Sequence, residues 1–264
     1  MPNPPNLPPL LDLHHVTVIR GDLPALNDLT LRINTGENVC ILGPNGCGKS
    51  TLIKTITREC YPLAREGSSI SIMGQDRWNI FELRSHLGIV SNDVPATPTQ
   101  ELTGLTVVLS GFFSSIGIWP HQHITDAMRA KAEQVLRRLE ALHLADRSIS
   151  GMSSGEARRI WIGRALVHDP ETLLLDEPTN SLDIHAAHEL RETMRKLARA
   201  GTGILLVTHH LSEIIPEIER VILMRAGRIF ADGPKDQILK PDILSNLFGL
   251  NVEIAQRDGY FHAW

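Results

Sequence analysis

The sequence has 264 residues, a formal net charge of −4 at pH 7 and 42% hydrophobic residues, which fits one large globular domain or a core with a subdomain. The charge argues against a general nucleic-acid binder. We therefore expect no nucleic-acid partner. No apolar run is long enough to cross a bilayer and the start lacks the features of a signal peptide, so we also expect no membrane insertion by this chain.

Residues 1–10 are rich in proline and asparagine, which predicts a disordered arm. The three cysteines include no C-x-x-C pair, so neither a disulfide framework nor a zinc site is predicted. This pattern of cysteines fits a cytoplasmic location, including a peripheral one on the inner face of the cell membrane.

Two antiparallel strands are predicted over 11–18 and 29–33, with a turn near Gly21. A short apolar strand follows over 37–42, and apolar residues at helical spacing predict a helix over 51–56. Between them the chain reads Gly43-Pro44-Asn45-Gly46-Cys47-Gly48-Lys49-Ser50-Thr51.

This segment matches the phosphate-loop pattern G-x-x-x-x-G-K-[ST] at every fixed position, in the expected strand–turn–helix context. The glycines let the backbone approach phosphate oxygens, and the helix points its positive end at the same anion. Lys49 supplies a mobile positive charge, and the Ser50 hydroxyl can ligate Mg²⁺. Cys47 lies near a lysine and a helix start, which we expect to favour its thiolate.

The rest of the chain alternates between the two kinds of element. Strands are predicted over 69–72, 87–90, 172–176, 203–208, 221–224 and 228–231, and helices over 77–84, 127–142, 183–200 and 211–218, with another ending near 167. Such alternation predicts an α/β fold with a mostly parallel sheet. The tail, 251–264, is predicted to form a hairpin across residues 257–259. An apolar, aromatic cluster at 112–119 fits either a subdomain core or a docking surface.

Three polar residues stand at the ends of predicted strands. Asp176 ends an apolar strand, where it can hold Mg²⁺ through water. Glu177 follows directly and can orient and deprotonate an attacking water. His209 ends another strand and can reach the γ-phosphate of a bound nucleotide. The helix after the acidic pair opens with Ser181-Leu182-Asp183.

Together these motifs resemble the ATP-binding cassette (ABC) ATPases over nearly the whole chain, 11–250. Met152-Ser153-Ser154-Gly155-Glu156 stands where the family signature Leu-Ser-Gly-Gly-Gln would be, and Asp183 matches the family's D-loop. The resemblance implies a RecA-like P-loop core with an antiparallel β subdomain and a helical subdomain at about 93–158. It also implies an ATPase that uses ATP and Mg²⁺, and a homodimer formed on ATP binding.

In such a dimer, Ser153 and the Gly155 amide of one subunit would cap the γ-phosphate held by the other. The chain departs from the family in its signature, where Ser154 replaces Gly and Glu156 replaces Gln. The usual Mg²⁺-contacting Gln corresponds to Asn92, and the usual adenine-stacking aromatic corresponds to the region of Arg20, whose guanidinium plane could stack instead.

Within the family, segments 77–84, 88–93 and 107–117 resemble metal-chelate importer cassettes and a soluble group linked with molybdenum uptake, called photorepair-like. One hypothesis is therefore a transport ATPase for a metal chelate or oxyanion, docking through 92–119 onto membrane-spanning permease subunits. The alternative is a soluble ABC ATPase in metal handling, stress response or repair. A weaker idea is metal binding through His121, His123 and the pair His209-His210, for which the sequence offers no third ligand.

Overall fold

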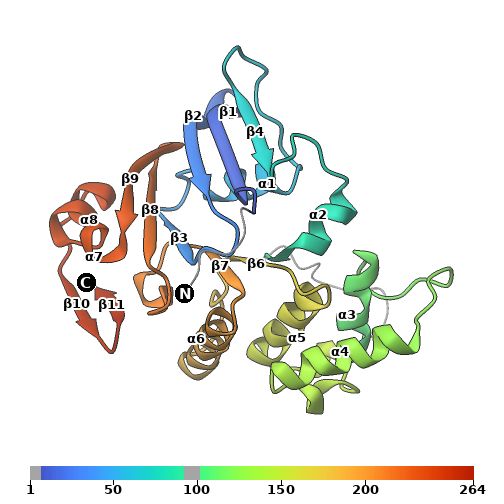
Figure 1. Ribbon diagram of the computed structural model, residues 1–264. Coiled ribbons are helices and arrows are strands. Elements are labelled where there is room, and N and C mark those ends of the chain that lie inside the picture. The colour runs from blue at the N-terminus through green and yellow to red at the C-terminus, as the bar shows by residue number, and fades with distance from the viewer. Residues whose placement is uncertain (1–6, 92–101) are drawn as a thin grey trace. The chain divides into compact units, whose positions relative to one another are not determined.

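The computed structural model describes residues 7–91 and 102–264, which fall into two compact units (Figure 1). The first unit comprises the described part of 1–80 together with 203–264, and the second comprises the described part of 81–202. Within the described ranges, no helix combines the length and apolar character needed to cross a membrane.

The first unit contains a three-stranded antiparallel sheet in the order β2-β1-β4 (Figure 1). Its strands are β1 (Leu11–Arg20), β2 (Leu23–Ile33) and β4 (Ser69–Ile72). β1 pairs with both neighbours, so that Leu11 lies opposite Ile33 on one side and Ile72 on the other. These three side chains are fully buried, which explains why the alternating pattern of the sequence produced this sheet.

Residues 8–10 pack against this sheet. Thr35 donates a hydrogen bond to the Pro8 carbonyl (2.7 Å), and the Met73 amide donates to the Leu10 carbonyl (3.0 Å). The Leu10 side chain is buried. The disordered arm predicted over 1–10 therefore extends too far, because Leu10 within it is buried in the core.

The core strands of the first unit are β3 (Val39–Leu42), β7 (Gly203–Thr208), β8 (Arg220–Arg225) and β9 (Arg228–Pro234). β3 lies between β7 and β8 and is parallel to both, while β9 pairs antiparallel with β8. Every residue of β3 and β7 is buried, as expected for parallel strands whose sequences are nearly continuous apolar runs. α1 (Lys49–Ile56) follows β3 after the phosphate loop.

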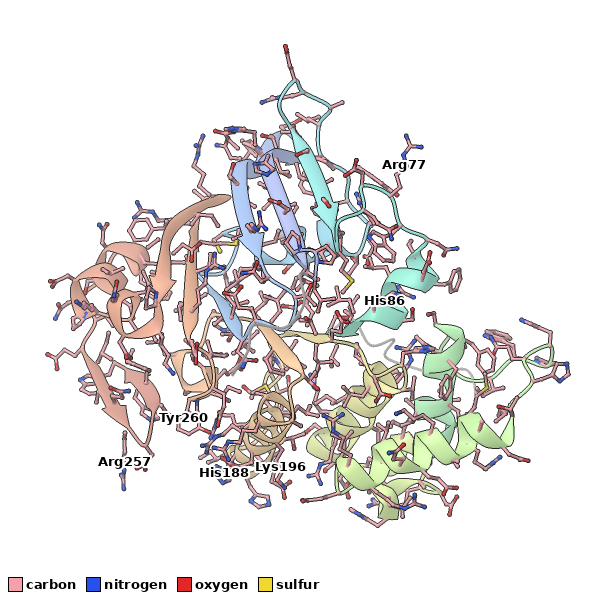
Figure 2. All side chains as sticks on the ribbon, viewed as in Figure 1. Arg77, His86, His188, Lys196, Arg257 and Tyr260 are labelled. Carbon is pink, nitrogen blue, oxygen red and sulfur yellow. The ribbon has the colours of Figure 1, made fainter. Side chains whose placement is uncertain are left out.

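The C-terminal part of the first unit contains α7 (Lys235–Ile238), α8 (Pro241–Phe248), β10 (Ile254–Arg257) and β11 (Tyr260–Ala263). β10 and β11 form a hairpin in which Arg257 lies opposite Tyr260, both labelled in Figure 2. α8 was not predicted from the sequence, although Pro241 at its start and Gly249 at its end are typical helix boundary signals.

The helix predicted over 211–218 is wrong. Only a single turn of 3₁₀ helix forms there, η4 (Leu211–Glu213). Pro216 has no amide hydrogen to donate and disfavours helical backbone at the residue before it, so the apolar spacing of this segment could not become a helix. Its isoleucines are buried in an irregular segment instead.

In the second unit, β5 (Leu87–Val90) and β6 (Thr172–Asp176) pair in parallel. The helices are α2 (Ile80–His86), which begins at the unit boundary, α3 (Gly104–Ser110), α4 (Asp126–Arg138), α5 (Ser154–Leu166) and α6 (Ile184–Arg199). Single 3₁₀ turns are η1 (Gly111–Phe113), η2 (Leu142–Leu144) and η3 (Ile149–Gly151). α2 starts three residues later than predicted, and α4 ends earlier because Glu140 adopts a positive φ of 55°.

Ion pairs connect the helices of the second unit. Lys196, labelled on α6 in Figure 2, pairs with Glu140 at 2.6 Å, and Arg159 of α5 pairs with Glu189 of α6 at 2.8 Å. Taken together, the two units show parallel core strands, an antiparallel sheet and a group of helices. The predicted α/β fold class is confirmed.

Candidate nucleotide site

The phosphate loop joins the end of β3 to the start of α1. Its first amide, on Gly43, donates to the Thr208 carbonyl at the end of β7 (3.4 Å). Its Cys47 carbonyl accepts a hydrogen bond from the Gly227 amide (2.8 Å). These two contacts hold the loop at the carboxyl edge of the parallel strands, which is where ligands bind in α/β sheets.

The start of α1 is open. Gly48 occupies the N-cap position with a left-handed φ of 111°, and neither a side-chain cap nor an acidic residue in the first turn is present there. A helix start has four amide hydrogens without partners inside the helix and carries a partial positive charge. At α1 no side-chain cap and no acidic residue in the first turn compensates these amide hydrogens and their positive charge, so the turn can bind an anion.

Lys49 lies over the loop and is buried. Its Nζ donates to the carbonyl of Gly43 (2.7 Å) and to that of Pro44 (3.2 Å). The ammonium group is thus already held at the loop by carbonyl oxygens. Phosphate oxygens can replace those acceptors and give stronger, charge-assisted hydrogen bonds.

Two further predicted residues, His209 and Arg20, belong to the first unit. His209 directly follows Thr208, the residue that bonds Gly43, and its ring lies 3.8 Å from that of His210. Arg20 ends β1 opposite Leu23 of β2 and donates from Nη1 to the Cys60 Sγ (3.3 Å). Gly48 approaches β2 closely, because a Cβ built on it would lie 2.5 Å from the Ala25 carbonyl oxygen.

The expected thiolate character of Cys47 is wrong. Burial raises the pKa of the thiol, and the lowering effect of Lys49 is smaller. Only 4% of the residue is exposed. A charged thiolate would lose its hydration in this position, so the neutral thiol is favoured.

In the second unit, Asp176 ends β6, and Glu177 follows with a positive φ of 45°. The Glu177 carbonyl accepts from the Asn180 amide (3.0 Å), so the chain turns directly after the acidic pair. Asp183 is the N-cap of α6, where its side chain accepts from the Ala186 amide (2.8 Å). This cap explains why Asp183 stands at the start of that helix.

The signature segment, Met152–Glu156, forms the start of α5. Ser153 Oγ accepts from the Glu156 amide (3.2 Å), and the Ser153 amide donates to Glu156 Oε2 (2.8 Å), which together make a capping box. Gly155 lies against α6, since a Cβ built on it would lie 2.7 Å from that of Ala186. The second unit thus brings the signature segment and the Asp183 turn together, with Ser154 exposed beside them.

Arg147 was not among the residues predicted from the sequence. Its Nη1 donates to Glu156 Oε1 (2.7 Å) and its Nη2 to the Gly151 carbonyl (3.0 Å). The Ser153 amide and, to a smaller extent, Arg147 lower the pKa of Glu156 and keep it charged. No local pattern predicted this pair, because nine residues separate its members.

Two other predictions concern metals. Asn92 lies outside the described residues. Within the described ranges, no group of three or more His, Cys, Asp or Glu side chains could hold a metal ion, so the histidine-based metal site finds no support there.

Comparison with known proteins decides the family. The profile of the family described as "ABC transporter" matches residues 26–180. The chain belongs to the ABC transporter family. An ABC transporter ATP-binding protein of Streptococcus mutans is 33% identical over 252 residues, which cover 94% of this chain and 95% of the relative. The iron(3+)-hydroxamate import ATP-binding protein of Bacillus subtilis is 30% identical over 89% of this chain and 86% of its own.

Solved ABC structures share the fold. A metal-chelate type ABC transporter in an inward-facing conformation matches 97% of this chain and 96% of its own, with a TM-score of 0.78 and 23% identity. A dimeric ATP-binding cassette bound to ADP and phosphate matches 85% of this chain and 98% of its own, with a TM-score of 0.69 and 26% identity. The family's ATP-binding proteins are the ATPases of transporters, and ATP binding and hydrolysis are therefore the activity of this ABC protein.

Proposed function

We propose that this ABC protein hydrolyses ATP at a site whose parts are the residues predicted from the sequence. The amides of Gly43–Thr51 and the Lys49 ammonium hold the phosphates. Glu177 orients and deprotonates the attacking water, and His209 contacts the γ-phosphate. The observation that carries this assignment is the open start of α1 beside a buried lysine, which together form an anion site.

Ser50 of the first unit and Asp176 of the second are the described residues that we propose to hold Mg²⁺. Ser50 is exposed at the start of α1, and Asp176 is partly exposed at the end of β6. Hydroxyl and carboxylate oxygens are the hard ligands that Mg²⁺ prefers, and Asn92 would add an amide oxygen. When bound, the ion neutralises charge on the phosphates. The chain's own residues hold the nucleotide and move the proton.

A second copy of the chain completes the site. Ser153 is exposed at the tip of α5, as is Ser154, so both are free to meet a phosphate held by another subunit. Gly155 and Glu156 support that tip, and Asp183 stabilises the adjoining turn. A cassette bound to ADP and phosphate that shares this fold is dimeric, which supports the same assembly here.

The ATPase drives a membrane transporter for a metal chelate or oxyanion. Relatives named for iron-hydroxamate and hemin import cover most of the chain and support this substrate class. Ile116 and Trp119 are large apolar residues that stay 39% and 49% exposed, as a surface for separate permease subunits requires. Arg164 donates to the Ser115 carbonyl (2.9 Å) and fixes that segment within the second unit.

The test of the chemical assignment is Glu177→Gln. This change keeps the shape and removes the base, so ATP hydrolysis should fall by about a hundredfold or more while ATP binding is retained. Glu66→Gln makes the same change at an exposed residue of the first unit and should hydrolyse ATP like the wild type. Equal hydrolysis rates in E177Q and E66Q would show that Glu177 is not the base.

The test of transport coupling is co-purification. The tagged protein is isolated from its native host in mild detergent without ATP, and the proteins that accompany it are identified. A stoichiometric membrane-spanning partner is expected. Recovery of the protein from the soluble fraction without such a partner would favour the soluble alternative in metal handling, stress response or repair.

A further inference from the structure

Arg147 connects two parts of the second unit. Through its backbone it belongs to a short antiparallel pairing, in which the Gly104 amide donates to the Arg147 carbonyl (3.0 Å). The Leu105 amide donates to the Ala145 carbonyl (2.8 Å), and the Ile149 amide donates to the Leu102 carbonyl (2.8 Å). Arg147 is thus anchored to the start of α3.

The side chain of Arg147 reaches the other way, into the signature segment. One guanidinium nitrogen donates to the Glu156 carboxylate and another to the Gly151 carbonyl, so the side chain contacts the last residue of the signature segment and the residue directly before its first. Glu156 is the third residue of α5, and its second oxygen is occupied by the Ser153 amide. The two carboxylate oxygens of Glu156 therefore accept hydrogen bonds from Arg147 and from Ser153, both of which lie within nine positions of it in the chain.

The charge of Glu156 creates a conflict. A carboxylate in the first turn of a helix stabilises that helix. The same carboxylate repels a triphosphate, and the tip of α5 is the part of the signature that would meet one. A guanidinium group paired with Glu156 removes this conflict, because the helix keeps its capping box and the tip has no net negative charge.

We propose that Arg147 is a positioning residue for the ATP-bridged dimer, and that it acts by neutralising Glu156 at the start of α5. The proposal rests on the proposed role of that segment in capping the nucleotide of a second copy. It also explains the Glu that stands in the signature where the family has Gln. Glu156 is tolerated because Arg147 pairs with it.

The pair contributes little to folding stability. About 47% of the Arg147 side chain and 27% of that of Glu156 are exposed to solvent, and exposed ion pairs contribute little to stability. A variant without the guanidinium group should therefore fold normally and fail only where the charge of Glu156 meets ATP. This separation makes a positioning role distinguishable from a structural one.

The experiment compares Arg147→Ala, Glu156→Gln and the double variant. ATP-dependent dimerisation is measured by size-exclusion chromatography in the Glu177→Gln background, and ATP hydrolysis is measured with Glu177 intact. Arg137→Ala is the matched control, because Arg137 forms an exposed ion pair with Glu133 at a similar distance of 2.9 Å on α4. Thermal unfolding of all variants is recorded in parallel.

We expect R147A to weaken dimerisation and hydrolysis by about tenfold, the effect of one unneutralised charge near a phosphate. The double variant should recover to within about threefold of the wild type, because glutamine at this position caps the helix without a charge. A merely structural role would not be rescued, since the Glu156→Gln change cannot restore the lost bond to the Gly151 carbonyl.

Two results would overturn the inference alone: an R147A protein that behaves like R137A, or a double variant as impaired as R147A. Wild-type protein that binds ATP but forms no ATP-dependent dimer would overturn the proposed function as well. ATP affinity of the isolated subunit, measured with a fluorescent ATP analogue, should be equal in all variants, because the signature segment is proposed to contact the nucleotide of a second subunit.

Discussion

Two helix starts, those of α1 and α5, are assigned to the same phosphates and are built in opposite ways. α1 begins at Gly48 without a side-chain cap and without an acidic residue in its first turn. α5 begins at Ser153 with a complete capping box, and its third residue is the carboxylate Glu156. One helix start is left open for an anion, and the other is closed by its own side chains.

The difference shows how each helix start is stabilised before a ligand arrives. At α1 the protein leaves the partial positive charge of the helix uncompensated and places the Lys49 ammonium beside it, which costs stability and favours phosphate binding. At α5 the start of the helix is capped by its own side chains, and the exposed Ser153 and Ser154 at its tip are the residues that we propose to contact a partner's nucleotide. We therefore expect the open start to bind phosphate in the free subunit and the closed start to act only when two subunits meet.

The backbone at the start of α1 offers the largest expected effect. Gly48→Ala adds a Cβ that would lie 2.5 Å from the Ala25 carbonyl oxygen, at a left-handed φ of 111°. We expect a loss of about 3 kcal/mol or more in the free energy of unfolding, from strain and from the clash. Urea unfolding measures the loss.

Gly46→Ala is the matched control for this prediction. Gly46 also has a positive φ, 77°, but a Cβ there meets nothing within 4 Å. Its cost should be about 1 kcal/mol, the strain alone. If the two variants were equally stable, close approach of β2 would not be the reason for glycine at position 48.

The charge at the start of α1 offers the next effect. Thr51 is the third residue of α1, the position that Glu156 occupies in α5. Thr51→Glu should stabilise the helix by about 0.5 kcal/mol and weaken ATP binding by about 2 kcal/mol, roughly thirtyfold, relative to Thr51→Gln. Unfolding and ATP titration would thus change in opposite directions.

The comparison of T51E with T51Q removes the effect of side-chain size, because the two residues differ only in charge. Equal ATP affinity of these two variants would show that the open start of α1 does not contact the phosphates. The distinction between an open and a closed helix start would then have no functional meaning.

The sequence predicted the open start well, and for a local reason. The strand before the phosphate loop, the loop itself and the helix after it follow one another within about twenty residues, and each is specified by its own residues. The same holds for Asp176 at the end of β6, whose apolar run is continuous. Local patterns of this kind need no knowledge of distant contacts.

The environment of the closed start could not be predicted in this way. The contact of Arg147 with Glu156 depends on the pairing of residues 145–149 with 102–105, forty or more positions earlier in the chain. Cys47 likewise has a distant contact, because its carbonyl accepts a hydrogen bond from the Gly227 amide, 180 positions later in the chain. The helix predicted over 211–218 failed because its apolar spacing was given more weight than Pro216.

Cys47 gives the smallest expected effect, and it tests which force dominates at the open start. The partial positive charge of α1 and the nearby Lys49 favour a thiolate, whereas burial favours the neutral thiol and raises the pKa. If burial dominates, iodoacetamide at pH 7.5 should alkylate Cys47 at least about tenfold more slowly than the partly exposed Cys60.

The pH dependence follows from the sign of the shift. Alkylation requires the thiolate, and a raised pKa moves ionisation of Cys47 to higher pH, so its rate should still be rising steeply above pH 9. Peptide mapping by mass spectrometry follows the two sites separately, and Cys60→Ser shows that modification at one site does not open the other. Rapid alkylation of Cys47 at neutral pH would mean that the open helix start and Lys49 outweigh burial.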